Sequence, residues 1–215
     1  MAQHGFESTS GDRAEQTGRL QRSASELQTL RRWAEAEALA DRACSLLAGA
    51  PDTPPLGRTC QALAGTLDDL GDHLRAETLY RRAGAIFAWL PTGGPDDCGR
   101  IRCARGLAAN LRIQQRSEEA EAILLAALGL AEQLLGPSDV DTLATMTGLA
   151  LLWEGLGRLD EAEELYRQAL GRAELTAGVE PREIAGISAA LAGLLERRAA
   201  TCLTGSAPGY QPLPG

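Results

Sequence analysis

The sequence has 215 residues and a formal net charge of −8 at pH 7. Alanine and leucine supply 37 and 35 of these residues, whereas valine and isoleucine together supply only 8. Because strands favour β-branched residues and helices favour alanine and leucine, the composition excludes a sheet protein and predicts an all-α fold. All 21 basic residues are arginine, and acidic residues outnumber them. This balance argues against non-specific nucleic-acid binding and against an anionic membrane surface, since both require a basic face.

The sequence shows no targeting or membrane-spanning pattern. Residues 1–14 contain acids and no apolar core, and no apolar run approaches the ~18 residues of a membrane helix. We therefore expect a cytoplasmic protein with disordered segments at 1–14 and 204–215 around one domain at 15–203. The five cysteines have no CxxC spacing and there are two histidines, so no disulfide framework, metal site or cofactor is predicted.

Four segments of the sequence repeat at intervals of 40 to 44 residues. Each opens with Ala-Glu, has an apolar residue three positions after the alanine, and has another alanine seven positions after it. These spacings place the three residues on one stripe of a helix. The opening alanines are Ala36, Ala76, Ala120 and Ala162, and the second alanines are Ala43, Ala83, Ala127 and Ala169.

A second helix is predicted before each of these segments. The fourth such run, LATMTGLALLWEGLGRLDE, has an apolar face that ends at Gly157, a residue suited to terminating a helix. Glycine- and proline-rich stretches separate the units. Segment 182–200 repeats the first-helix pattern without a partner helix. The sequence therefore predicts a stacked array of four helical hairpins plus one closing helix.

These units resemble the tetratricopeptide repeat. The fourth unit carries its pattern most fully, at Met146, Leu149, Ala150, Trp153, Gly157, Leu159, Ala162, Tyr166 and Ala169. The period near 42 and the phrase LGPSDVDTLATM are similar to the long repeats of the kinesin light chain family. The third unit departs from the pattern, with Gln115 in place of the turn glycine and Leu124 in place of the aromatic residue. The resemblance implies a right-handed α-solenoid whose first helices line a concave groove.

The candidate binding residues are those that this register places in the groove. They are Arg58, Gln61, Arg102, Arg105, Arg112, Thr147 and Glu154. The three arginines of the third unit lie on one helical face, and guanidinium groups suit carboxylates of a partner. Two interpretations stay open. The face is either a basic pocket for an acidic peptide or C-terminal carboxylate, or a solvated arginine surface balanced by Asp68, Asp69 and Glu154.

The resemblance favours a scaffold or adaptor that binds a peptide or helix of a partner protein. The alternative is a structural element that self-associates through the face of Leu27 and Trp33, or serves as a spacer within a larger protein. An enzyme is not predicted, because the sequence offers neither an activated nucleophile nor metal ligands.

Three other groups of residues are interpreted as structural. His73 is expected to pack, because the sequence places no aspartate, serine or cysteine partner near it at a usable spacing. The cysteines are expected to be small buried residues rather than a redox pair at Cys98 and Cys103. The acidic clusters on the second helices are expected to lie mainly on the convex, solvated face, with i to i+4 pairs such as Glu163 with Arg167 and Glu164 with Gln168.

Overall fold

The structure, a computed structural model, describes residues 15–23, 26, 33–48, 50–176 and 178–204. Residues 15–23 are helical. The helices that follow are α2 (Trp33–Leu47), α3 (Pro54–Asp69), α4 (His73–Ala88), α5 (Asp97–Ile113), α6 (Ser117–Leu134), α7 (Val140–Gly155), α8 (Leu159–Leu175) and α9 (Pro181–Thr204). Of the segments predicted to be disordered, residues 1–14 and 205–215 lie outside the described residues, as do Leu27 and the side chain of Trp33. Thr204, placed in the disordered tail by the prediction, is the last residue of α9. The predicted all-α array is confirmed.

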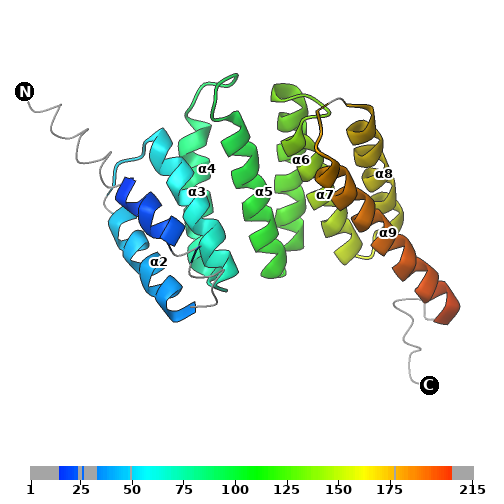
Figure 1. The fold of residues 1–215 in the computed structure, drawn as a ribbon, viewed down its shortest axis with the longest axis horizontal. Helices are drawn as coiled ribbons and strands as arrows, with labels where there is room; N and C mark the ends of the chain where they lie inside the picture. Colours follow the sequence, from blue (N-terminus) through cyan, green and yellow to red (C-terminus); the bar gives the residue numbers. More distant parts are fainter. Residues whose placement is uncertain (1–14, 24–25, 27–32, 49, 177, 205–215) are drawn as a thin grey trace, which may run out of the picture.

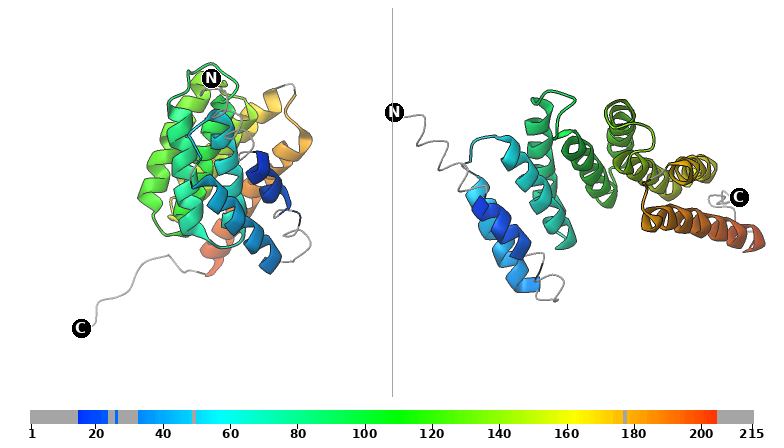
Figure 2. Two further views of the ribbon diagram at one scale, coloured as in Figure 1. Left: turned by 90° about the vertical axis from the view of Figure 1, so that its left-hand side faces the viewer. Right: turned by 45° about the horizontal axis from the view of Figure 1, so that its top comes forward.

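The helices stack as successive hairpins along one axis (Figure 1). The pairs α3 with α4, α5 with α6, and α7 with α8 form the hairpins, and α9 packs against α7 and α8. The backbones of the first helices α3, α5 and α7 also approach one another in order. The backbones of the second helices α4, α6 and α8 lie farther apart, and long side chains bridge them, as in the pairs Arg81 with Glu119 and Arg172 with Glu132. The array is therefore curved, with the first helices and α9 on its inner side (Figure 2). Its concave surface belongs to α3, α5, α7 and α9.

Small buried residues allow this close packing. The eight alanines that mark the repeat, at the first and eighth positions of each segment, are all buried. Tyr80, Leu124 and Tyr166 occupy one register of α4, α6 and α8, and all three are buried. Leu124 thus takes the place of an aromatic ring within the same layer of the core. The predicted helical stripe is confirmed by this burial.

Three hairpin turns share one backbone geometry. Gly71 and Gly157 have positive φ angles of 85° and 77°, and Gln115, at the corresponding turn, has a φ of 64°. In each turn the following residue donates a backbone hydrogen bond to the carbonyl five residues before it, for example Arg158 N to Trp153 O at 2.9 Å. The Gln115 turn therefore keeps the repeat geometry with a residue that is less suited to it.

Side chains at two turns also cap the next helix. The carboxylate of Asp72 accepts a hydrogen bond from the backbone N–H of Arg75 at 3.0 Å, and that of Asp139 accepts one from Asp141 at 2.8 Å. None of the helices within the described residues is long and apolar enough to cross a membrane.

Candidate functional site

The concave surface brings the predicted arginines of α3 and α5 together. Arg58 and Arg102 face each other across a hollow of about 260 Å³ between these two helices. Its other lining residues are Gln61, Ala62, Pro95, Asp96, Cys98 and Gly99. Arg58 pairs with Asp96 and remains half exposed. Three of the predicted residues, Arg58, Gln61 and Arg102, thus share one hollow.

Arg102 and Arg105 bind an internal carboxylate. The Nε of Arg102 donates to both carboxylate oxygens of Asp141 at 2.8 and 2.9 Å, and Nη1 of Arg105 lies 3.4 Å from Asp141 Oδ1. The side chain of Asp141 is only 5% exposed. These hydrogen bonds raise the pKa of Arg102. The two arginines therefore link α5 to α7, and part of their charge is already compensated.

Arg112 differs from these two. It is exposed on α5, and it forms no ion pair with any described residue. It lines a small hollow between α5 and α7, together with Arg105, Ala108, Ala109, Leu124, Gly148, Leu151 and Leu152. Arg112 is thus a basic group of the concave surface whose charge is not compensated within the described chain.

The two predicted residues of α7 have different surroundings. Thr147 donates its hydroxyl to the carbonyl of Leu143 at 2.9 Å and lines an apolar pocket between α7 and α9. Glu154 forms an ion pair with Arg197 of α9 and is largely buried. Glu154 therefore helps to hold the closing helix in place.

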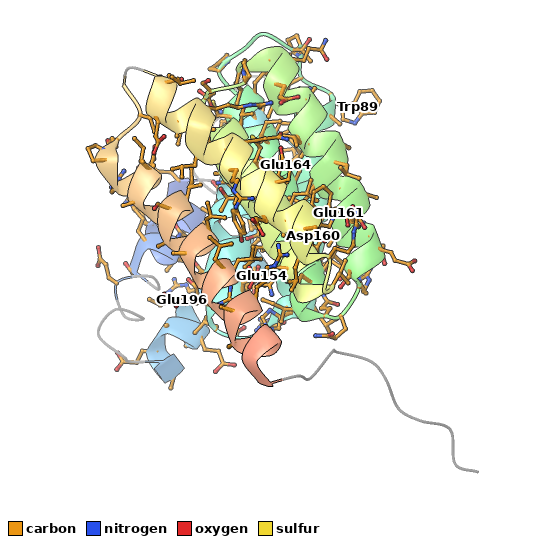
Figure 3. All side chains as sticks on the ribbon, turned by 90° about the vertical axis from the view of Figure 1, so that its right-hand side faces the viewer. Trp89, Glu154, Asp160, Glu161, Glu164 and Glu196 are labelled. Carbon is orange, nitrogen blue, oxygen red and sulfur yellow. The ribbon has the colours of Figure 1, made fainter. Side chains whose placement is uncertain are left out.

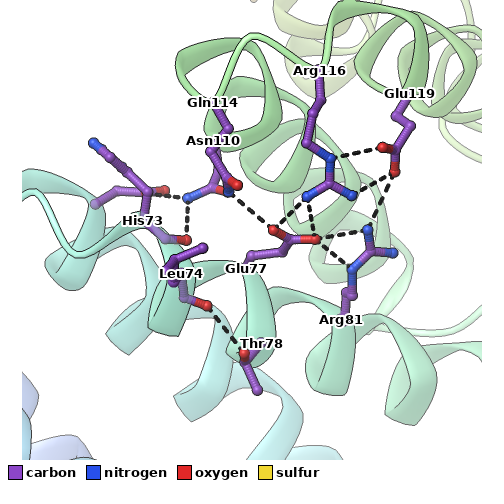
Figure 4. A network of polar contacts seen from close by, with 10 residues as sticks. His73, Leu74, Glu77, Thr78, Arg81, Asn110, Gln114, Arg116 and Glu119 are labelled. Atoms are coloured by element: carbon purple, nitrogen blue, oxygen red, sulfur yellow. Dashed lines mark hydrogen bonds and ion pairs between the residues drawn. The ribbon is translucent and has the colours of Figure 1, made fainter.

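The prediction that His73 has no acidic partner is wrong. Its Nδ1 lies 2.9 Å from the carboxylate of Asp68, five residues earlier, because the turn at Gly71 brings the end of α3 beside the start of α4. Asn110 of α5 donates to the same carboxylate at 2.5 Å and to the carbonyl of His73 at 3.0 Å (Figure 4). This group joins three helices, which is a structural role.

The clustered acidic residues of the second helices mainly face solvent, as expected, with Glu121 and Glu163 as the exceptions. The glutamate of the Ala-Glu pair binds an arginine of the next unit in three of the four repeats: Glu77 binds Arg116, Glu121 binds Arg158, and Glu163 binds Arg198. Glu37 of the first repeat is exposed. The side chains of Glu77, Glu121 and Glu163 are 13, 23 and 11% exposed. The repeated glutamate therefore links successive units, and its recurrence beside a buried alanine was the available signal.

Glu77 shows the electrostatics of this link most clearly. Burial raises the pKa of its carboxyl, but hydrogen bonds from Arg116, Gln114 and Arg81 outweigh this effect and lower the pKa to about 2 (Figure 4). Glu121 accepts from the indole nitrogen of Trp153 at 2.7 Å and from Arg158, and these bonds lower its pKa as well.

The remaining acidic residues of α8 are exposed. Asp160, Glu161 and Glu164 lie along this helix on the side seen in Figure 3. The two predicted i to i+4 pairs are confirmed, since Glu163 contacts Arg167 and Glu164 accepts from Gln168 at 2.9 Å. Within the described residues, no group of three or more acidic, histidine or cysteine side chains could hold a metal ion.

The described cysteines are free thiols in buried or half-buried positions. Burial raises the pKa of Cys60 to about 11 and that of Cys103 to about 12, so both stay protonated near neutral pH. Burial also raises the pKa of Cys98. The interpretation of these residues as packing side chains rather than reactive thiols agrees with these surroundings.

Comparison with known proteins identifies the repeat. Residues 100–174, which cover most of α5 to α8, match the tetratricopeptide repeat family. Residues 100–174 are therefore tetratricopeptide repeats. Repeats of this family generally serve protein–protein interaction. No curated protein matches the sequence.

Several solved structures share the fold of this chain. BtubC (BKLC) from P. vanneervenii is 16% identical with a TM-score of 0.61, covering 98% of this chain and 96% of that one. A Podospora anserina putative kinesin light chain with nearly identical repeats is 22% identical with a TM-score of 0.62, covering 87% and 96%. PilF of Pseudomonas aeruginosa is 17% identical with a TM-score of 0.56, covering 89% and 72%. At these identities the likeness concerns the fold alone.

Proposed function

We propose that the concave surface binds an extended segment of a partner protein whose acidic side chains contact the arginines of α3 and α5. The observation that carries this proposal is Arg112, an exposed guanidinium beside an apolar hollow with no ion pair among the described residues. Arg58 and Arg102 supply further basic charge in the neighbouring hollow between α3 and α5. Guanidinium groups bind carboxylates through paired hydrogen bonds, which favours an acidic segment.

The affinity of such a surface is expected to be modest. An extended segment loses chain freedom on binding, and the salt bridges at the rim of the groove remain in contact with water. The contribution of Arg112 should therefore weaken as the salt concentration rises.

A matched pair of charge reversals tests the proposal. Arg112→Glu changes the free arginine of α5, and Arg42→Glu makes the same change at an exposed position of the second helix α2. Arg112→Glu should reduce capture of the partner from cell extract by ~10-fold, whereas Arg42→Glu should leave it unchanged. Equal effects of the two changes would contradict the proposal that the groove binds an acidic segment.

Site-specific crosslinking locates the bound segment. A photoreactive residue at Ala109, exposed beside Arg112, should crosslink the captured protein through an acid-containing peptide. The same residue at Ala126, exposed on the second helix α6, is the control. Stronger crosslinking from position 126 would place the partner on the other face. The pair Arg102 and Arg105 should be tested together with Asp141→Asn, since their loss alone leaves that carboxylate unpaired.

A further inference from the structure

The concave surface contains a second pocket, between α7 and α9, with different chemistry. It measures about 240 Å³ and is lined by Val140, Leu143, Ala144, Thr147, Glu183, Gly186 and Ile187. Most of these side chains are apolar. A Cβ atom added at Gly186 would meet no atom within 4 Å, so the space above this residue is open. The pocket can therefore receive a side chain from a bound segment.

One wall of this pocket carries a carboxylate with an unpartnered oxygen. Glu183 is the one charged residue among the described residues that line it. Its Oε2 atom is buried and has no hydrogen-bond partner in the described part of the chain. The adjacent Arg182 pairs with Glu180 at 2.8 Å and does not compensate it. A carboxylate oxygen that has lost its water without gaining a partner is costly, and a cation nearby offsets this cost.

We propose that this pocket takes a lysine side chain from the same partner segment. The methylene stem packs against Val140, Leu143 and Ile187, and the ammonium group pairs with Glu183 after its carboxylate rotates. Binding requires both the aliphatic stem and the positive charge of the lysine, because the pocket is lined by apolar side chains and has an acidic residue at one wall. This assignment rests on the proposed function, because the rest of the same partner segment is taken to bind the arginines of α3 and α5.

The composition of the chain restricts the source of this lysine. The chain contains no lysine, since all 21 basic residues are arginine. A second copy could therefore supply only arginine, and the lysine must come from another protein. The long aliphatic stem of lysine suits the narrow apolar pocket better than a planar guanidinium does.

The basic hollow between α3 and α5 and the pocket between α7 and α9 give the two ends of the groove opposite charge. Basic residues line the groove at α3 and α5, whereas α7 contains no basic residue. At the α9 end, the acidic residue Glu183 lines the pocket. Neighbouring helices pack about 8–10 Å apart, so α5 lies about 12–15 Å from the second pocket. An extended segment covers that distance with about four residues. The preferred segment carries acidic residues followed, about four positions away, by a lysine.

A methyl-labelled protein provides a direct test, because the chain has only six isoleucines and two valines. N-acetyl-lysine methylamide, titrated into the full chain, should shift the methyl resonances of Val140 and Ile187 with saturation. The norleucine analogue, which has a similar stem without the charge, should bind at least ~3-fold more weakly. Glu183→Gln should lower the affinity for the lysine probe to that of norleucine. Glu180→Gln, the matched control, should change neither.

A pocket-filling variant gives an independent check. Gly186→Leu adds a side chain where the backbone leaves open space, and leucine is also the better helix former. It should abolish the methyl shifts caused by both probes without unfolding the protein.

Several results would overturn the assignment. These are the absence of methyl shifts with lysine, equal binding of lysine and norleucine, or an unchanged affinity in Glu183→Gln. Tighter binding of the arginine analogue would also overturn it and would indicate a second copy of the chain. Arg112→Glu should leave binding of the lysine probe intact, so failure of the acidic groove and failure of the lysine pocket can be told apart.

Discussion

The α5–α6 and α7–α8 hairpins align in sequence with an offset of 42 residues, yet their surfaces differ. Arg102 and Arg105 on α5 correspond to Ala144 and Thr147 on α7, so one helix presents charge where the other presents small side chains. Their buried alanines are the same. The packing between helices restricts the buried positions, whereas the concave positions can change without loss of the fold.

The same two hairpins differ in how tightly they meet the preceding unit. A Cβ atom at Gly106 would lie 2.5 Å from the ring of Tyr80, whereas one at the equivalent Gly148 would lie 3.7 Å from Leu124. The aromatic ring on α4 therefore requires a glycine on α5, and the smaller leucine on α6 removes that requirement. The departure at Leu124 is therefore understood through the residue that it faces on the next first helix.

The largest effect on stability is expected from the α5 side of this comparison. Replacing Arg102 and Arg105 with alanine leaves the buried carboxylate of Asp141 without its partners. The arginines are themselves partly in water, so the free energy of unfolding should fall by about 2 kcal/mol. Urea unfolding measures this loss. Adding Asp141→Asn should recover part of it, and no recovery would show that the carboxylate was not the cause.

The two equivalent glycines should respond in opposite directions. Gly106→Ala forces the Tyr80 ring to move and should destabilise the protein by about 1–2 kcal/mol, even though alanine favours helices. Gly148→Ala meets only ordinary contacts and should stabilise it by up to about 1 kcal/mol. The melting temperatures of both variants, measured in the same buffer, test this prediction. Equal changes in stability would mean that the Tyr80 ring can move aside without an energetic cost.

The link between α4 and the α5–α6 hairpin should titrate in acid. The pKa of Glu77 is about 2 in the folded chain and 4.5 ordinarily, so its contribution to stability is complete above pH 4.5. That contribution should decrease as the pH falls from 4.5 towards 2. Glu77→Gln should cost about 1 kcal/mol at neutral pH and weaken this dependence.

The control for this titration is Glu118→Gln, which changes an exposed glutamate of α6. Its effect on stability should be negligible at every pH. An acid dependence that persists in Glu77→Gln would assign the effect to other carboxylates, and urea unfolding across this pH range measures it.

The smallest effect is expected at the hairpin turns. Gln115 has the positive φ angle that Gly157 adopts at the equivalent position. Gln115→Gly should therefore stabilise the protein by about 0.5–1 kcal/mol, whereas Gly157→Ala should destabilise it by a similar amount. Differential scanning calorimetry can resolve the two shifts. A loss of stability in Gln115→Gly would show that the glutamine side chain contributes more than the backbone strain removes.

The sequence by itself determined the helices, their pairing and the buried alanine stripe, because these depend on local periodicity and on the size of side chains. Only the tertiary structure decided which charges meet. Asp141 binds two arginines 39 and 36 residues earlier, and Asn110 reaches Asp68 across 42 residues. Such partners come together through the stacking of units, and helical periodicity does not specify them. The groove could therefore be placed from the sequence, but the arginine it leaves uncompensated could not.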